Sequence, residues 1–215
     1  MLINCKKTKI IVFNTSTKYA FEPELCFPGG EQLEVVQQAR LLGVQISNDL
    51  TWTNHVKDIT TRAVKKLWVL IRFKNIGAST NQLVQVYQSR IRRMLENSAP
   101  VFISGLTQEQ IRSIEMVQKK AFVIILGHDY MSYENALSIL NLERLDVRRE
   151  SLCLSFANKC TQSAKHCAMF PPNPNLRPDS RHPKPFYEPL CNTARHFNSA
   201  IPALARLLNK SALNQ

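Results

Sequence analysis

The sequence WTNHVKDITTRAVKKLWVLIR, residues 52–72, marks the point where the hydrophobic period of the chain changes. Its apolar residues recur at steps of three and four, which places them on one side of an α-helix. These residues are Val56, Ile59, Ala63, Leu67 and Leu70. Residues 52–74 carry six cations, most of which fall away from that stripe. They are Lys57, Arg62, Lys65, Lys66, Arg72 and Lys74. The stretch therefore predicts an amphipathic, basic helix that begins near Trp52.

Before Trp52 the pattern is typical of β-structure. Residues 8–13 are rich in β-branched and aromatic side chains. Residues 21–25 and 33–36 flank a Pro28-Gly29-Gly30 turn signal, which predicts a hairpin. Residues 39–46 predict a third strand, in which Gly43 would serve a bulge or a close backbone approach. Together these segments predict a small antiparallel sheet within residues 8–47.

After residue 72 the helical period continues. A second helix carries Leu83, Tyr87, Ile91 and Met94, and Pro100 is expected to end it. Thr107 and Gln110 have the spacing of a capping box before a third helix that would end at Gly127. Ser132 is a candidate cap for a helix over 133–140, and residues 147–159 predict another helix.

The last part of the chain is rich in proline, which predicts an extended tail rather than a packed element. The prolines after Phe170 that carry this prediction are Pro171, Pro172, Pro174, Pro178, Pro183, Pro185 and Pro189. A short helix is expected over 203–208, after Pro202. The predicted fold class is α+β: a small antiparallel sheet, then a mostly helical body, then the tail. The predicted regions are 1–47, 48–100, 101–170 and 171–215.

Charge is distributed unevenly over the 215 residues. Lys and Arg number 28 against 16 Asp and Glu, a formal net charge of +12. Residues 48–99 hold nine basic and three acidic groups, and residues 171–215 hold six and two. A concentrated basic patch favours a polyanionic partner such as nucleic acid or an acidic membrane surface. No apolar run is long enough to cross a bilayer, so no membrane span is expected.

The six cysteines are scattered, and the start of the chain lacks the pattern of a secretory signal. Free thiols in a reducing, intracellular compartment are therefore expected, with nucleus and cytoplasm both open. Cys153, Cys160, His166 and Cys167 lie close in sequence but do not have zinc-site spacing. Buried cysteines on a helix face explain this group better.

Catalytic patterns are not found. Two-metal chemistry on phosphates uses paired carboxylates, but no two of the aspartates are adjacent. Asp129 beside His128 follows a helix-ending glycine, which indicates a loop or capping role. The sequence contains no Gly-x-Ser-x-Gly elbow and no phosphate-binding glycine-rich loop. No metal or cofactor is expected.

Residues 2–13, 42–44, 50–56 and 87–100 form an ordered series of blocks. In this order they resemble the reverse transcriptases of non-LTR (LINE-type, jockey-like) retrotransposons. The first block, residues 2–13, is similar to the family's Leu-Asn-x-x-Lys-Thr-Lys…Phe segment, which follows the catalytic core. Leu42-Gly43-Val44 and then residues 50–56 resemble its Leu-Gly-Val…Leu-x-Trp-x-x-His-Ile block. Residues 87–100 resemble its Tyr…Ile-Arg…Leu-Glu-Tyr…Pro segment, with Asn97 in place of the usual aromatic. Further similar blocks are 118–127, 133–137, 148–149, 170–172 and 199–202.

The resemblance implies a fragment that lacks the family's Asp-Asp motif and hence polymerase activity, although the parent enzymes use Mg²⁺. Residues 1–47 would be the end of the palm, with a primer-grip turn near Leu42, Gly43 and Val44. Residues 48–100 would be thumb helices, and residues 101–170 a linker region. Lys7, and Lys9 beside it, would lie near the triphosphate of an incoming nucleotide. The six cations from Lys57 to Lys74, both included, would contact the phosphate backbone of a primer–template without sequence preference. That primer–template could be RNA or DNA.

Two function classes stay open on this evidence. The chain is either an inactive reverse-transcriptase remnant that still binds nucleic acid, or a basic helical module adopted by the host for protein or DNA interaction. A relic without function is a third alternative. An exposed edge of the small sheet also predicts self-association.

Overall fold

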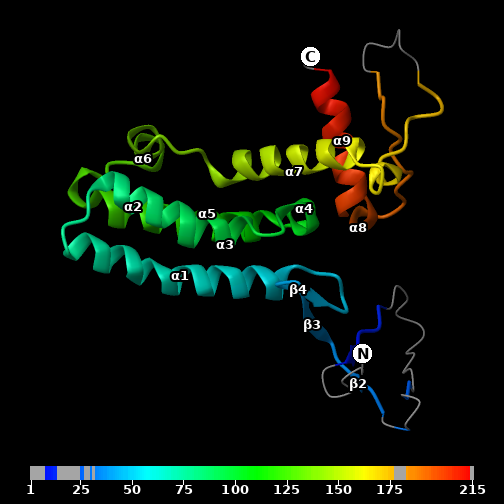
Figure 1. Ribbon diagram of the computed structural model, residues 1–215, viewed down its shortest axis with the longest axis horizontal. Coiled ribbons are helices and arrows are strands. Elements are labelled where there is room, and N and C mark those ends of the chain that lie inside the picture. The colour runs from blue at the N-terminus through cyan, green and yellow to red at the C-terminus, as the bar shows by residue number, and fades with distance from the viewer. Residues whose placement is uncertain (1–7, 14–24, 27–29, 31, 177–182, 214–215) are drawn as a thin grey trace. The chain divides into compact units, whose positions relative to one another are not determined.

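The computed structural model describes residues 8–13, 25–26, 30, 32–176 and 183–213 (Figure 1). The chain divides into two compact units, Met1–Asp58 and Ile59–Gln215. The fold is α+β with a mostly helical body, as the sequence predicts. The predicted region limits at residues 100 and 170 both fall inside the second unit.

The first unit contains an antiparallel hairpin of β3 (Gln38–Leu41) and β4 (Val44–Ser47), in which Leu41 pairs with Val44. The two turn residues both have positive φ, 48° for Leu42 and 89° for Gly43. That combination is typical of a type I′ turn, whose twist matches that of the flanking strands. The prediction of one strand over 39–46 with a bulge at Gly43 is therefore wrong. Leu42 and Gly43, for which the family resemblance implies a primer-grip role, are the residues of this turn, and Val44 begins β4.

The other strand pair in this unit is parallel. β1 (Lys9–Ile10) pairs with β2 (Glu34–Val35), with Lys9 opposite Glu34. The prediction of an antiparallel sheet thus holds for β3–β4 and is wrong for β1–β2. A parallel pair needs a long connection, and the chain between Ile10 and Glu34 is long enough. The predicted hairpin over 21–36 lies mostly outside the described residues, although Cys26 and Gln32 form an antiparallel bridge.

Contacts within the first unit tie the hairpin to the start of α1 (Thr53–Asn75). Arg40 forms an ion pair with Asp58, and the Gln45 N–H donates to His55 Nδ1 at 3.3 Å. His55 is almost fully buried. Its ring lies edge-on to the ring of Trp52, with the two ring centroids 6.2 Å apart. These contacts give His55 a packing role in the unit.

α1 continues into the second unit, where its apolar stripe is buried as predicted. Ile59, Ala63, Leu67 and Leu70 are all at most 6% exposed.

The next helical segment is divided into α2 (Thr80–Val86), the π-helical turn η2 (Tyr87–Arg92) and α3 (Arg93–Glu96). The predicted end at Pro100 is wrong, because Asn97 is already extended and Pro100 lies in the first turn of α4 (Ala99–Phe102). Proline is well tolerated there, since the first turn needs no amide donor.

The remaining predicted helices are confirmed. α5 (Gln108–Leu126) starts with the capping box of Thr107 and Gln110 and ends at Gly127. Ser132 caps α6 (Tyr133–Leu140), and α7 (Leu145–Gln162) extends beyond the predicted limits at both ends. Short 3-10 turns follow α4, α5 and α7: η3 (Ile103–Gly105), η4 (Gly127–Asp129) and η5 (Cys167–Met169).

The described parts of the proline-rich segment, residues 171–176 and 183–190, are largely extended, and Phe186 packs against the helical body. The backbone of this segment bridges Pro172 to Phe186, and the segment leads to α8 (Ala194–Phe197) and α9 (Ala200–Ala212). Figure 1 shows α9 crossing the end of α7. The two helices share a core cluster consisting of Cys153, Ala157, Cys160, Phe170, Leu204, Ala205 and Leu208. The expectation that no packed element follows Phe170 is therefore wrong, and the helix predicted over 203–208 is longer.

Candidate nucleic-acid interface

The cations of α1 that lie in the second unit gather on one side of the helix. At about 100° per residue, Arg62, Lys65, Lys66 and Arg72 fall within about a third of the circumference, and Lys66 is the member nearest the buried Ala63 and Leu70. Lys65 and Arg72 are exposed, whereas Arg62 and Lys66 are half-buried. We call these four residues the cation row. Lys57, also exposed on α1, belongs to the first unit.

The cation row includes two adjacent lysines, Lys65 and Lys66. Neither Lys65 nor Lys66 forms an ion pair with a carboxylate in the described part of the chain. Arg72 lies over the ring of Trp68, 5.0 Å from its centroid, and Trp68 is 60% exposed. The charges of Lys65 and Lys66 therefore remain available to an anionic partner.

Lys74, predicted to contact a nucleic-acid backbone, forms hydrogen bonds to the end of α5. Its Nζ donates to the carbonyl oxygens of Ile124 at 2.7 Å and Ile125 at 3.2 Å. These carbonyls belong to the last turn of α5, where the negative end of the helix dipole favours a cation. Lys74 thus joins α1 to the end of α5, and we leave it out of the interface.

A groove lies beside the cation row, between α1 and the α2–η2 segment. Its volume is about 910 Å³. Apolar side chains form much of its lining, and Lys66 and Arg90 add positive charge to it. No carboxylate lines it in the described chain. Its lining includes Lys66, Val69, Phe73, Gln85, Val86 and Arg90.

Arg90 was not among the predicted site residues. The signal for it was the cluster of Arg90, Arg92 and Arg93 beside an apolar stripe. Arg92 approaches Glu96 at 3.8 Å, and the same Glu96 accepts a 2.6 Å bond from Arg148. Arg90 is exposed and has no such carboxylate neighbour among the described residues. Sequence alone could not tell which arginine would be neutralised.

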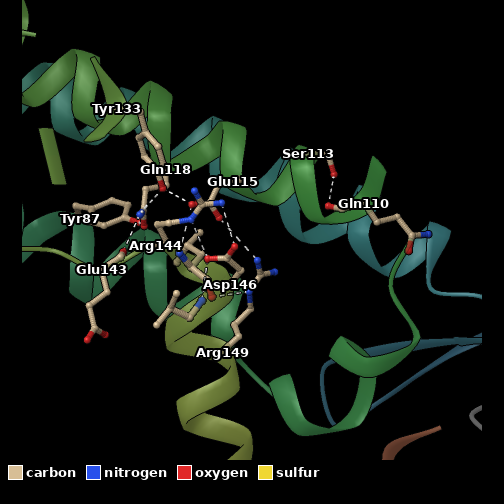
Figure 2. A network of polar contacts seen from close by, with 12 residues as sticks. Tyr87, Gln110, Ser113, Glu115, Gln118, Tyr133, Glu143, Arg144, Asp146 and Arg149 are labelled. Atoms are coloured by element: carbon tan, nitrogen blue, oxygen red, sulfur yellow. Dashed lines mark hydrogen bonds and ion pairs between the residues drawn. The ribbon is translucent and has the colours of Figure 1, made fainter. Parts of the chain in front are cut away.

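A buried polar network lies in the second unit (Figure 2). Glu115 of α5 accepts hydrogen bonds from the Tyr133 hydroxyl and from the Leu145 N–H, the latter at 3.3 Å. Its Oε2 lies 3.8 Å from Nη2 of Arg149, which is 1% exposed. Gln118 donates to the Tyr133 hydroxyl at 2.9 Å and to the Glu143 carbonyl at 3.0 Å. Tyr87 donates to Gln118, which brings η2 into the network.

Burial sets the protonation of this network. It raises the pKa of Tyr87 and, together with the hydrogen bond to Glu115, that of Tyr133, so both hydroxyls stay protonated donors. Burial lowers the pKa of Arg149. None of the network residues lines the groove. We interpret the network as a structural link between α5, α6, α7 and η2.

The remaining described residues singled out in the sequence lie outside the cation row and the groove. Cys153 and Cys160 are buried, as the sequence interpretation had it, and burial raises the pKa of Cys153 to about 11. Lys9 pairs with Glu34 at 3.1 Å on the surface of the first unit, while Lys7 lies outside the described residues. Leu42 is 92% exposed and Val44 buried. In the described chain, no three His, Cys, Asp or Glu side chains gather as metal ligands would.

Comparison with family models, with curated proteins and with solved structures gives no match for this chain. Among the described helices, none combines the length and apolar character needed to cross a membrane.

Proposed function

We propose that this chain binds nucleic acid without sequence preference, through contacts between phosphates and the cation row of α1. The observation that carries the proposal is the grouping of these cations on one side of an ordered helix, with Lys65 and Lys66 free of carboxylate partners in the described chain. The lysines of such a helix can contact the phosphate backbone of a nucleic acid while the apolar side of the helix stays packed in the protein. The resemblance to the thumb of non-LTR reverse transcriptases supports the same surface.

The proposal contains no catalytic step. The aspartates Asp49, Asp58, Asp129, Asp146 and Asp179 include no adjacent pair, so the sequence offers no Asp-Asp motif for two-metal phosphoryl transfer. Binding by phosphate contacts alone predicts similar affinity for unrelated sequences, because phosphates carry no sequence information. It also predicts a strong dependence on salt, since each contact releases counterions.

The test is a salt titration of fluorescence anisotropy on two unrelated DNA duplexes. For duplex DNA, log K should fall with log salt by about 0.9 per phosphate contact. In the variant Lys65→Ala/Lys66→Ala we expect weaker binding to both duplexes and a slope smaller by up to about two units.

A matched control removes the same charge elsewhere. Lys159 and Lys165 are exposed near the end of α7, and Lys159→Ala/Lys165→Ala should leave the slope unchanged. An equal effect of both double variants would mean that net charge, not the row on α1, determines binding. A loss confined to one duplex would indicate base readout and contradict the proposal.

A further inference from the structure

We propose that the groove beside the cation row holds an unpaired base of a single-stranded nucleic acid whose phosphates lie along that row. The inference rests on the proposed function and names its preferred substrate, a strand with accessible bases. It concerns the groove between α1 and α2–η2, all of which lies in the second unit.

The groove and the cation row share one border. Lys66 belongs to both, because it lines the groove and neighbours Lys65 on α1. Arg90 adds a second positive charge from η2. A strand that follows the row therefore passes the mouth of the groove, with cations in place for the phosphates on either side of an inserted base.

The interior of the groove suits a nucleobase. Phe73 lines it and is 41% exposed, so its ring is available for stacking. Val69 and Val86 add apolar surface, and the Gln85 amide can donate to and accept from a base edge. Grooves that combine backbone cations with an aromatic platform are the usual means of binding single strands. The volume of about 910 Å³ is in the range of small-molecule pockets, which is room enough for a base.

An acidic amphipathic peptide is the other occupant that such a groove admits. Charge complementarity fits both, but a peptide confined to the groove leaves Lys65 and Arg72 unused. A nucleic-acid strand uses the groove and the row together. In a duplex the bases are paired and stacked, so the groove contributes nothing to duplex binding, and this separates the inference from the proposed function.

The experiment compares three labelled probes by fluorescence anisotropy: an oligothymidylate, an abasic oligonucleotide with the same number of phosphates, and a duplex. Stacking of one base predicts that the oligothymidylate binds at least about fivefold more tightly than the abasic strand. Phe73→Leu should reduce that ratio towards one and leave duplex binding and its salt slope unchanged. Gln85→Glu, which places a carboxylate in the groove, should weaken oligothymidylate binding more than duplex binding.

The control is Phe156→Leu, which changes an equally exposed phenylalanine on α7 that does not line the groove. It should alter none of the three affinities. Equal binding of oligothymidylate and abasic strand by the wild type would overturn the inference while leaving the proposed function standing. Absence of binding to all three probes would remove both. Binding of an acidic amphipathic peptide that responds to Gln85→Glu, with no response of the oligothymidylate, would assign the groove to a protein partner.

Discussion

Arg149 is nearly inaccessible, yet it carries a guanidinium group whose Nη atoms have no hydrogen-bond partner among the described residues. Its nearest compensating charge is Glu115, 3.8 Å away. A buried charge that loses its partner is costly, because neither water nor another group replaces the lost interaction. Glu115 therefore stabilises the second unit mainly by its charge.

This assignment predicts an order of effects for two variants. Glu115→Gln keeps the shape of the side chain but removes its charge, so we expect a loss of about 3 kcal/mol in the free energy of unfolding. Tyr133→Phe removes the hydrogen bond to Glu115 and the one accepted from Gln118, and should cost about 2 kcal/mol. Urea unfolding followed by circular dichroism measures both. A Tyr133→Phe variant less stable than Glu115→Gln would contradict the role given to the charge.

The network was not predicted from the sequence. Glu115 lies between apolar positions of α5, and Arg149 lies in a run of charged residues, so each looks like an ordinary surface residue. Their burial depends on α6 and α7 covering α5, which local patterns do not report. Lys74 shows the same limit, since its partners are carbonyls fifty residues away in the chain.

At the scale of elements, the end of α5 depends on two residues that must fit together. Gly127 has a φ of +61°, and a Cβ built on it would lie 2.6 Å from Lys74 Nζ. Any other residue there would adopt an unfavourable backbone conformation and displace the lysine that binds the last carbonyls. Gly127 was predicted as a helix end, but its fit against Lys74 was not.

The variant Gly127→Ala should lower the free energy of unfolding by about 2 kcal/mol, through backbone conformation and through the clash. Lys74→Met should cost about 1 kcal/mol by removing the capping cation. In the double variant the clash with Nζ is gone, so the combined loss should be smaller than the two single losses together. Thermal unfolding of all four proteins tests this, and strict additivity would refute the contact.

Helix limits set by local chemistry were predictable, as the capping box at Thr107 and the cap at Ser132 show. The β-hairpin of β3 and β4 was harder to predict from the sequence. Leu42 is not a usual residue for a type I′ turn, in which Asn is preferred at its position, and periodicity alone favoured a single strand over 39–46. Turn type therefore decided the structure of that segment more than propensity did.

In the second unit, the side chain of Asn209 attaches the proline-rich segment to α9. It pairs with the backbone of Phe186 as a neighbouring strand would. Asn209 of α9 accepts from the Phe186 N–H at 2.9 Å, and its amide donates to the Phe186 carbonyl at 3.0 Å and to Glu188 at 2.9 Å. Such bonds join segments far apart in sequence. Proline density predicted the extended backbone correctly but carried no information about this partner.

Glu188 makes this attachment sensitive to acid. Burial raises its pKa, but hydrogen bonds from Lys184 and Asn209 outweigh that effect and hold the pKa below its ordinary value. Its contribution to stability is therefore present above about pH 4.3, the usual glutamate pKa, and is lost as pH falls through the lowered native pKa. Glu188→Gln should cost about 0.5 kcal/mol at pH 7 and flatten the loss of stability on acidification. Equal pH dependence of both proteins would contradict this link.

Lysine footprinting distinguishes the lysines of α1 that we propose to contact nucleic acid, Lys65 and Lys66, from Lys74, which caps α5. The whole chain is acetylated briefly with and without a DNA duplex, and modification at each lysine is measured by mass spectrometry. We expect the duplex to protect Lys65 and Lys66 and to leave Lys159 and Lys165 unchanged, with Lys74 slow to react in both samples. Protection of Lys159 and Lys165 but not of Lys65 and Lys66 would rule out α1 as the nucleic-acid interface.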